Sequence, residues 1–314
     1  MRRLGADGPL VGAIGLGCMP LSFGYVDAPS EGDPVTLVHR AIDLGITFFD
    51  TADVYGPFTN EEAVGSALRG RRDEVTLATK VGLLVGPNGG YPLTSDARPE
   101  RIATEIDESL RRLDTDHIDL YYLHRVDPKV PLEESWGALA SLVRTGKVGA
   151  IGLCEVGVDQ LDRMHAIHPV AAVQSELSLW TRDALAEVVP WCAANGTAFV
   201  PFSPLGRGFL TGTITEASFD TTDFRSRNPR FTAEAVQANQ GIVSTVRVVA
   251  EGLGATPAQV AIAWTLAQGD HVIPIPGTKR LRYLDENAAA AGVTLRADDM
   301  ATLDELPEPS GARY

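Results

Sequence analysis

The chain has 314 residues, of which 44% are hydrophobic and 22% charged, which is the composition of an ordinary globular protein. Its formal net charge of −14 argues against nucleic acid or an anionic membrane surface as the main partner. No long apolar run indicates a signal peptide or a membrane-spanning helix. Three scattered cysteines without metal-ligand spacing predict buried thiols in a reduced, cytoplasmic protein and no metal site.

The first elements alternate short apolar strands with helices. Residues 11–21 read VGAIGLGCMPL, but Pro20 stands where the dinucleotide-binding pattern G-x-G-x-x-G needs its third glycine, so we expect a short barrel strand at 14–17 behind a hairpin. A helix is predicted over 34–44 with Gly45 as its stop, then a strand over 46–49. Tyr55 follows on a loop, and Asn60 is predicted as the N-cap of the next helix.

Strand and helix patterns continue in alternation to the end of the chain. The helix predicted over 99–113 is amphipathic, with Arg101, Glu105, Glu108 and Arg112 expected to face outward. Further strands are expected at 75–80, 118–123, 148–153, 171–174, 198–202 and 272–275. Further helices are expected at 132–144, 160–167, 183–194, 241–252 and 257–268, with helical segments through 306. One long interruption, 203–239, is rich in Gly, Thr, Arg and Pro.

These patterns predict one fold for the whole chain. The eight strands are short, continuous apolar runs, which is typical of a parallel sheet covered on both faces. Eight strand–helix repeats without a linker favour a single α/β domain over residues 1–314, a closed (β/α)₈ TIM barrel, over an open doubly wound sheet. An N-terminal β-hairpin and extra helices near the end of the chain complete the prediction.

Polar residues end three successive strands of this barrel. Asp50, Lys80 and His124 follow the strands, and Tyr55 lies on the loop after the first of them. Active sites of such barrels form at the carboxyl ends of the strands, so we expect the four side chains in one cluster. A tyrosine titrates at about 10 in water, and a nearby ammonium lowers that pKa. Lys80 could supply the ammonium and Asp50 could hold it, which predicts Tyr55 as a proton donor to an oxygen that becomes negative.

Several segments resemble the signature segments of the aldo-keto reductase superfamily. They are DTADVYG, ATKVG, DLYYLHRVDP, PFSPLGRGFLTG and IPGTKRLRYLDEN, in the expected order and over essentially the whole chain. The LHRVDP form is similar to bacterial branches that include relatives of the potassium-channel β-subunit. The resemblance implies a (β/α)₈ barrel that binds NADPH without a Rossmann loop, with the catalytic tetrad on Asp50, Tyr55, Lys80 and His124. It implies that Tyr55 protonates a carbonyl oxygen while nicotinamide delivers hydride to the carbon.

The resemblance also implies a set of cofactor contacts. Cys154, Glu155 and Gln174 match the positions that hold the carboxamide, where the family usually has Ser, Asn and Gln, and Phe202 matches the aromatic residue that stacks on nicotinamide. The segment that follows the pyrophosphate matches Ser203, Pro204, Leu205, Gly206 and Arg207. The adenosine clamp matches Gly277, Thr278, Lys279, Tyr283, Glu286 and Asn287, and Gly17, Cys18, Met19 and Asp50 complete the expected site.

The charge near the adenosine end bears on the choice of cofactor. The family often has an arginine at the position of Tyr283, and here the basic residues are Lys279, Arg280 and Arg282. Such a cluster would let an acidic protein bind a 2′-phosphate, which predicts NADPH/NADP⁺ with NADH as an alternative. A solvated helix face is the other reading of this basic run.

The sequence thus predicts an NADPH-dependent reductase of a small carbonyl compound, with no nucleic-acid or membrane partner, as a monomer or a homo-oligomer. An NADPH-binding regulatory subunit with little catalysis is the alternative from another class. A Schiff-base aldolase is weaker, because Asp50 would keep Lys80 charged and non-nucleophilic. Trp180, just past the strand that carries Gln174, is expected either to line the substrate mouth or to pack in the core.

Overall fold

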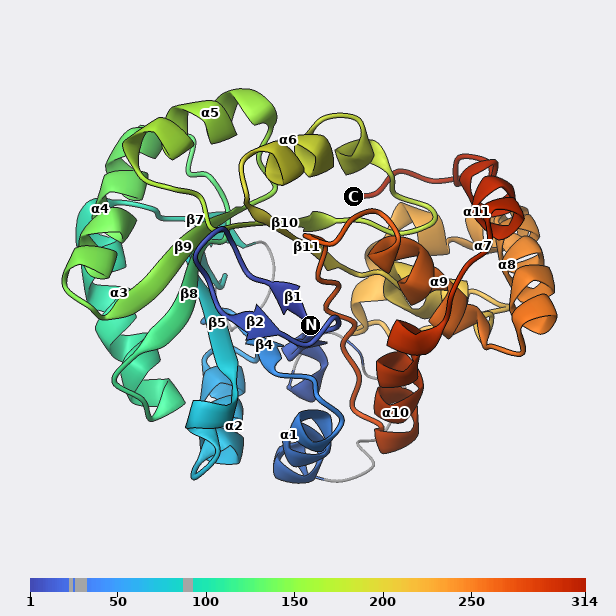
Figure 1. The fold of residues 1–314 in the computed structure, drawn as a ribbon, viewed down its shortest axis with the longest axis horizontal. Coiled ribbons are helices and arrows are strands. Elements are labelled where there is room, and N and C mark those ends of the chain that lie inside the picture. Colours follow the sequence, from blue (N-terminus) through green and yellow to red (C-terminus); the bar gives the residue numbers. More distant parts are fainter. Residues whose placement is uncertain (23–24, 26–32, 87–92) are drawn as a thin grey trace.

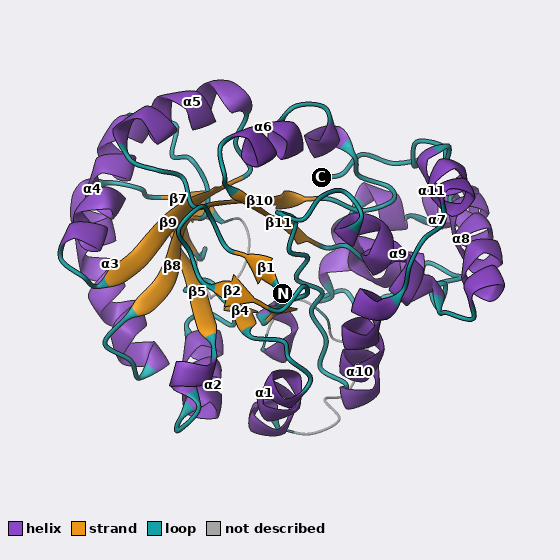
Figure 2. Cartoon of the chain, viewed as in Figure 1, coloured by secondary structure: helices purple, strands orange, loops and turns teal. Residues whose placement is uncertain are grey.

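The strands form the centre of a barrel in the computed structural model, which describes residues 1–22, 25, 33–86 and 93–314. Seven parallel strands pair in the order β11-β10-β9-β8-β5-β4-β3. Their bounds are β3 Leu16–Gly17, β4 Phe48–Asp50, β5 Thr76–Val81, β8 Ile118–Leu123, β9 Val148–Cys154, β10 Ala172–Glu176 and β11 Ala198–Phe202. Figure 2 shows these strands inside a ring of helices.

An extended segment over residues 271–275 closes the barrel between β11 and β3. Phe199 pairs with Val272 in parallel, Ile273 donates to the Phe199 carbonyl at 2.8 Å, and Gly15 donates to the Pro274 carbonyl at 2.9 Å. Prolines at 274 and 276 have no N–H to give to a ladder, so this eighth strand is hydrogen-bonded only in part. The predicted (β/α)₈ barrel is therefore confirmed.

Helices surround this barrel on its outside (Figure 1). The first six are α1 Pro34–Asp43, α2 Thr59–Leu68, α3 Pro99–Leu113, α4 Leu132–Arg144, α5 Val158–Ile167 and α6 Val188–Ala194. The later ones are α7 Ala233–Ala238, α8 Gln240–Leu253, α9 Pro257–Leu266, α10 Leu281–Ala289 and α11 Ala297–Asp304, of which α7, α8 and α11 gather on one side. Among the described residues, no helix is long and apolar enough to cross a membrane.

Two short antiparallel pairs lie outside the barrel sheet. They are β1 Arg2–Arg3 with β2 Leu10–Val11, and β6 Leu83–Leu84 with β7 Thr94–Ser95. The first pair is the predicted N-terminal hairpin and lies across one end of the barrel (Figure 1). Its Arg2 guanidinium donates to the carbonyls of Leu266, Gly269 and Val272, which ties the hairpin to the closing segment.

The helix after Tyr55 begins differently from the prediction. α2 starts at Thr59, and Phe58, in the left-handed region at φ 68°, occupies the N-cap position. Asn60 is fully buried and does not cap: it accepts a hydrogen bond from Thr51 Oγ1 at 2.6 Å and donates to the Cys18 carbonyl at 2.9 Å. The prediction of Asn60 as N-cap is wrong because tertiary contacts use this side chain.

The outward face predicted for the 99–113 helix is wrong at two of its four positions. Arg112 and Glu105 are buried, and Arg112 binds both Glu105 and Glu61 of α2, at 2.5 and 2.6 Å. Thr79 donates to the other oxygen of Glu61 at 2.6 Å. A polar periodicity cannot distinguish a solvated helix face from one that pairs its charges across a helix–helix contact.

Two further predictions needed adjustment. The helix expected over 183–194 is split into a 3₁₀ turn, Asp183–Leu185, and α6. The interruption over 203–239 contains the 3₁₀ turns Gly206–Thr211, Phe224–Arg227 and Pro229–Phe231 as well as α7.

Candidate active site

Three polar side chains meet at the carboxyl ends of neighbouring strands. Asp50 is the last residue of β4, Lys80 the last but one of β5, and His124 follows β8 directly. Because β4, β5 and β8 pair in that order, their ends lie side by side. Lys80 is completely buried, and Asp50 and His124 are almost so. The structure thus brings the strand-end residues together as their order predicts.

The Lys80 ammonium is the centre of the cluster. It donates to Asp50 Oδ1 at 2.5 Å, to the Thr51 carbonyl at 2.7 Å and to the Tyr55 hydroxyl at 3.4 Å. The second oxygen of Asp50 accepts from the Gln174 side chain at 2.8 Å. The rings of Tyr55 and His124 pack edge to face, with their centroids 5.9 Å apart.

Burial dominates the electrostatics of the four groups. It raises the pKa of Tyr55 above 10, and the opposing charge of Lys80 reduces this rise without cancelling it. The expectation that Lys80 lowers the phenol pKa is therefore right for its own contribution and wrong for the net direction. Burial, then Lys80 and Arg125, hold the pKa of His124 well below its usual range, so its imidazole is neutral.

The charges of Asp50 and Lys80 depend on each other. Burial raises the pKa of Asp50, although Lys80 and Gln174 act in the opposite direction. Burial alone would lower the pKa of Lys80, but Asp50 and its other neighbours raise it above its usual value. The pair is thus a buried ammonium that one carboxylate keeps charged, which is a strongly coupled arrangement.

The positions expected to hold nicotinamide lie on the next strands. Cys154 ends β9 and pairs in register with Gln174 of β10, and Phe202 ends β11 with a half-buried ring. Burial raises the pKa of the Cys154 thiol to about 12, so it is neutral. The Glu155 carboxylate accepts hydrogen bonds from the Glu176 backbone and from Arg313, at 3.0 and 2.7 Å. Its partners are therefore these two groups and not the Gln174 side chain, which donates to Asp50.

The segment after β11 makes a tight left-handed turn. Ser203, Gly206 and Arg207 have φ of 51°, 55° and 57°, and Gly206 donates to the Ser203 carbonyl at 2.9 Å. Positive φ is costly for side chains other than glycine and is often found at functional sites. Pro204 and Leu205 complete the turn, and the buried Arg207 guanidinium lies over the Phe224 ring.

Residues 277–287 lie beyond the closing segment. Lys279 donates to the Tyr25 carbonyl at 2.7 Å, which ties this segment to the loop after β3, and Thr278 accepts from the Arg280 backbone at 3.2 Å. Tyr283 of α10 has the Arg282 guanidinium over its ring at 4.5 Å. Glu286 and the buried Asn287 lie on the same helix.

Gly17 of β3 and neighbouring residues of the expected site have packing roles of their own. A Cβ on Gly17 would lie 2.7 Å from the Ile275 carbonyl, and one on Gly277 would lie 2.6 Å from the Gly17 carbonyl. The buried Cys18 donates its backbone N–H to the Asp50 carbonyl at 2.8 Å, and Met19 begins a 3₁₀ turn. Of the two readings of Trp180, the structure supports packing, since the ring is buried and stacks on Phe209 at 4.8 Å.

Three residues near the site escaped the sequence-based prediction. Asn60 supports the Tyr55 loop, and Glu176 and Arg313 form an ion pair beside Phe202. Glu176 gave one signal, because it lies two positions after Gln174 and therefore on the same face of the strand. Arg313 gave none, since no local pattern shows where residues 305–314 return to the barrel.

Comparisons with known proteins agree with this geometry. The model of the Aldo/keto reductase family matches residues 13–308. A soybean (Glycine max) protein named Probable aldo-keto reductase 1 is 44% identical over 317 residues, which span 99% of this chain and 91% of the relative.

Comparison with solved structures points to the same family. The glycerol dehydrogenase AKR11B4 of Gluconobacter oxydans superposes with a TM-score of 0.87 at 30% identity, over 97% of this chain and 94% of that one. An aldo/keto reductase of Klebsiella pneumoniae, solved in complex with NADP and acetate, gives a TM-score of 0.76 at 28% identity, over 99% and 98% of the two chains. These matches show an NADPH-using oxidoreductase of aldehydes and ketones, and the chain belongs to the aldo-keto reductase family.

Proposed function

We propose that this chain reduces an aldehyde or ketone to the alcohol, with Tyr55 as the general acid. The observation that carries the proposal is the Lys80 ammonium, which lies between the Asp50 carboxylate and the Tyr55 hydroxyl. A phenol beside a buried cation can release its proton to a developing alkoxide, because the cation stabilises the phenolate that remains.

The described residues fit NADPH, which supplies the hydride when it is bound. Phe202 offers a half-buried aromatic face at the end of β11, and the Gln174 amide lies beside Asp50 in the barrel mouth. Lys279, Arg280 and Arg282 supply the cations that phosphates need. We assign the nicotinamide end to Cys154, Gln174 and Phe202, the pyrophosphate to 203–207, and the adenosine end to 277–287, with 17–19 between them.

Each tetrad residue then has a distinct task. Tyr55 gives its proton to the carbonyl oxygen, and neutral His124 orients that oxygen without competing as an acid. Lys80 stabilises the resulting phenolate, and Asp50 holds Lys80 in place and charged. The same ion pair argues against a Schiff-base aldolase, since a protonated lysine is not a nucleophile.

The decisive experiment compares wild type with Tyr55→Phe. We expect the variant to lose carbonyl reduction by roughly 10²- to 10⁴-fold, because general-acid catalysis contributes on that order. The Kd for NADPH, measured by fluorescence titration, should stay close to the wild-type value. Turnover at the wild-type rate in Tyr55→Phe would refute the mechanism.

The substrate panel should test carbonyl compounds of different size and polarity with NADPH and NADH in parallel. Glyceraldehyde and dihydroxyacetone belong in it, because one solved relative is named a glycerol dehydrogenase. We expect NADPH to be preferred through the basic residues at 279–282. Equal kcat/KM with both cofactors would show that these residues do not contact a 2′-phosphate.

A further inference from the structure

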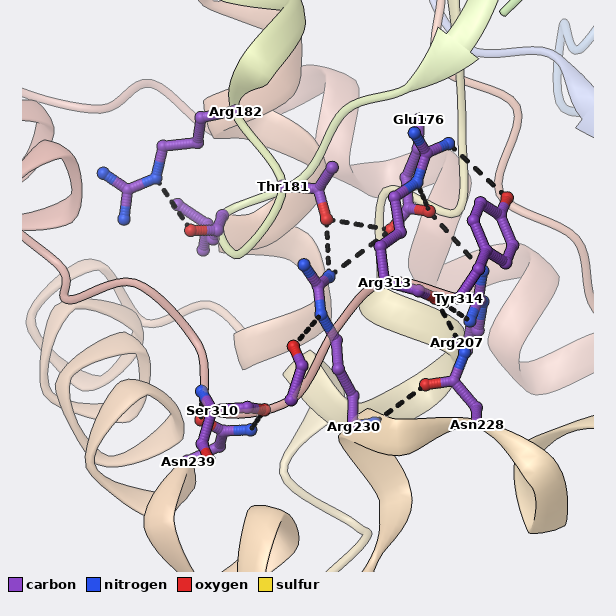
Figure 3. Close-up of polar contacts among 12 residues, drawn as sticks. Glu176, Thr181, Arg182, Arg207, Asn228, Arg230, Asn239, Ser310, Arg313 and Tyr314 are labelled. Carbon is purple, nitrogen blue, oxygen red and sulfur yellow. Dashed lines mark hydrogen bonds and ion pairs between the residues drawn. The ribbon is translucent and has the colours of Figure 1, made fainter.

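Residues 310–314, here called the clasp, lie across the ends of the strands that carry the expected nicotinamide positions. Side chains from the interruption after β11 hold its backbone (Figure 3). Asn239 exchanges two hydrogen bonds with the Ser310 backbone, at 2.8 and 3.1 Å, and Asn228 donates to the Arg313 carbonyl at 2.9 Å. Arg230 donates to the Gly311 carbonyl at 3.4 Å.

The Arg313 side chain makes the contacts that link the clasp to the strands. Its Nε donates to Glu176 Oε2 at 2.8 Å and its Nη2 donates to Glu155 Oε1 at 2.7 Å. Its guanidinium lies over the Phe202 ring, 5.6 Å from the centroid. The Arg313 side chain is 24% exposed, so these interactions are only partly screened by solvent.

These contacts coincide with the wall assigned to nicotinamide. Glu155 directly follows Cys154, and its backbone N–H donates to the Gln174 carbonyl at 3.0 Å. Glu176 pairs in register with Phe202 across β10 and β11. One arginine thus touches or adjoins the strand ends of β9, β10 and β11 that would hold the ring and its carboxamide.

We propose that Arg313 is a positioning residue for the nicotinamide half of the cofactor and that the clasp slows cofactor release. A planar guanidinium over one face of Phe202 leaves the opposite face for the nicotinamide and restrains the ring between them. Its two charge-assisted hydrogen bonds hold Glu155 and Glu176 in a fixed geometry. This inference rests on the cofactor assignment made above.

Glu176 keeps other partners when Arg313 is removed, so a variant can be tested. Arg207 and Arg230 lie 3.5 and 3.8 Å from its oxygens, and Thr181 donates to it at 3.0 Å. The carboxylate would therefore not be left buried and unpaired, which is the situation that strongly destabilises a fold. Arg313→Met retains an unbranched apolar stem and removes the guanidinium, with its charge, its hydrogen bonds and its contact with the Phe202 ring.

The test uses the full chain with Arg313→Met and measures NADPH release by stopped-flow fluorescence. We expect release to be roughly tenfold faster and the Kd to rise in parallel, because side chains that Arg313 no longer holds must be ordered when NADPH binds, at a cost of this order. A fragment that lacks nicotinamide, 2′-phospho-ADP-ribose, should bind wild type and variant equally. A variant that is merely damaged would lose affinity for both ligands, and that result would overturn the proposal.

Two controls make the outcome specific. Arg163→Met removes an exposed arginine–glutamate pair between α4 and α5 and should leave NADPH release unchanged. Arg313→Lys, which can pair with only one carboxylate at a time, should give an intermediate release rate. If Arg313→Met does not fold, Glu155→Gln carries the same test, since it removes the charge of one of the two carboxylates that Arg313 binds and leaves the Glu176 contact.

The possible failures are distinguishable. Wild type that does not bind NADPH would overturn the proposed function itself. Wild type that binds NADPH, with a variant that releases it at the same rate, would overturn only the role of Arg313. Tighter NADPH binding in Arg313→Met would show that the clasp competes with the cofactor, and would also contradict the proposal.

Discussion

Lys80 shows how one buried charge can organise a cluster of polar side chains. Its ammonium has oxygen partners on Asp50, Thr51 and Tyr55, so its three donors are all directed toward named acceptors. The Coulomb attraction to Asp50 offsets the loss of hydration that burial imposes. The cation is therefore held in place within the fold, so the proton transfer proposed for Tyr55 would need no reorganisation of Lys80.

The pKa directions predict the pH dependence of reduction. Tyr55 must be protonated to act as an acid, and burial raises its pKa, so activity should persist as the pH rises to 10 and fall only above it. The His124 pKa is lowered from 6.5, so the imidazole should stay neutral below that pH as well. A profile of kcat/KM against pH, measured with saturating NADPH, checks the acidic and the basic side of this prediction. If activity already falls near neutral pH, the charge of Lys80 lowers the Tyr55 pKa by more than burial raises it.

At the residue scale, the sequence was sufficient where strand order alone decides proximity. Asp50, Lys80 and His124 could be grouped because each ends a successive strand of a parallel barrel. The direction of the Tyr55 pKa could not be predicted, because it depends on how completely the ring is buried. The bond between Glu155 and Arg313 joins residues 158 positions apart, and no local pattern reports such a pairing.

The contact between α2 and α3 depends on a charged group inside the protein. Arg112 binds Glu61 and Glu105, and its guanidinium also lies over the Phe58 ring at 4.8 Å. Phe58 and Glu61 belong to the segment that begins the helix after Tyr55. The ion-pair cluster therefore supports the loop that carries Tyr55, although it lies on the outer side of β5.

Replacing Arg112 tests this support. Arg112→Met leaves the buried Glu61 carboxylate without its cation, whereas Glu105 keeps its pair with Arg101. We expect a loss of about 3–5 kcal/mol in the free energy of unfolding. The neighbouring Arg111→Met removes an exposed pair with Glu108 and should cost about 0–1 kcal/mol. Urea unfolding monitored by circular dichroism measures the free energy of unfolding of both variants. Similar losses in the two variants would contradict a special role for the buried pair.

Element boundaries were predicted best where capping and periodicity agree. The bounds of α3 and α4 and of β8 and β11 match their predicted ranges. The 183–194 helix was split, and the closing segment has few ladder bonds because its prolines cannot donate. Asn60 was misassigned because the same amide can cap a helix or bind distant groups, and its tertiary partners are not visible in the local sequence.

At the scale of the molecule, the barrel closes along a seam where two glycines let the backbone segments approach. Gly17 of β3 and Gly277 after the closing segment leave no room for a Cβ, since backbone atoms lie within 3 Å of each position. The seam thus depends on close backbone packing as well as on hydrogen bonds. A single domain over 1–314, which we propose from the continuous ring of elements, requires this seam to be intact.

Gly17→Ala tests the seam. The added methyl would meet the Ile275 carbonyl at 2.7 Å, and we expect a loss of about 1–3 kcal/mol in the free energy of unfolding, as for other overpacked positions. Gly137→Ala in α4 is the matched control. Its Cβ would meet nothing within 4 Å, so it should stabilise the helix by about 0.5–1 kcal/mol. Thermal unfolding that shifts in the same direction for both would be inconsistent with this account.

The contacts of Arg2 also determine when the fold can be completed during synthesis. They join residue 2 to carbonyls that lie 264, 267 and 270 positions later. While the chain leaves the ribosome, the strands from β3 to β11 can pair in sequence, but their two outer edges remain open until residues 271–275 emerge. Open edges invite pairing with other chains. We therefore expect the nascent protein to expose an open sheet until the closing segment emerges, with aggregation competing against ring closure at that stage.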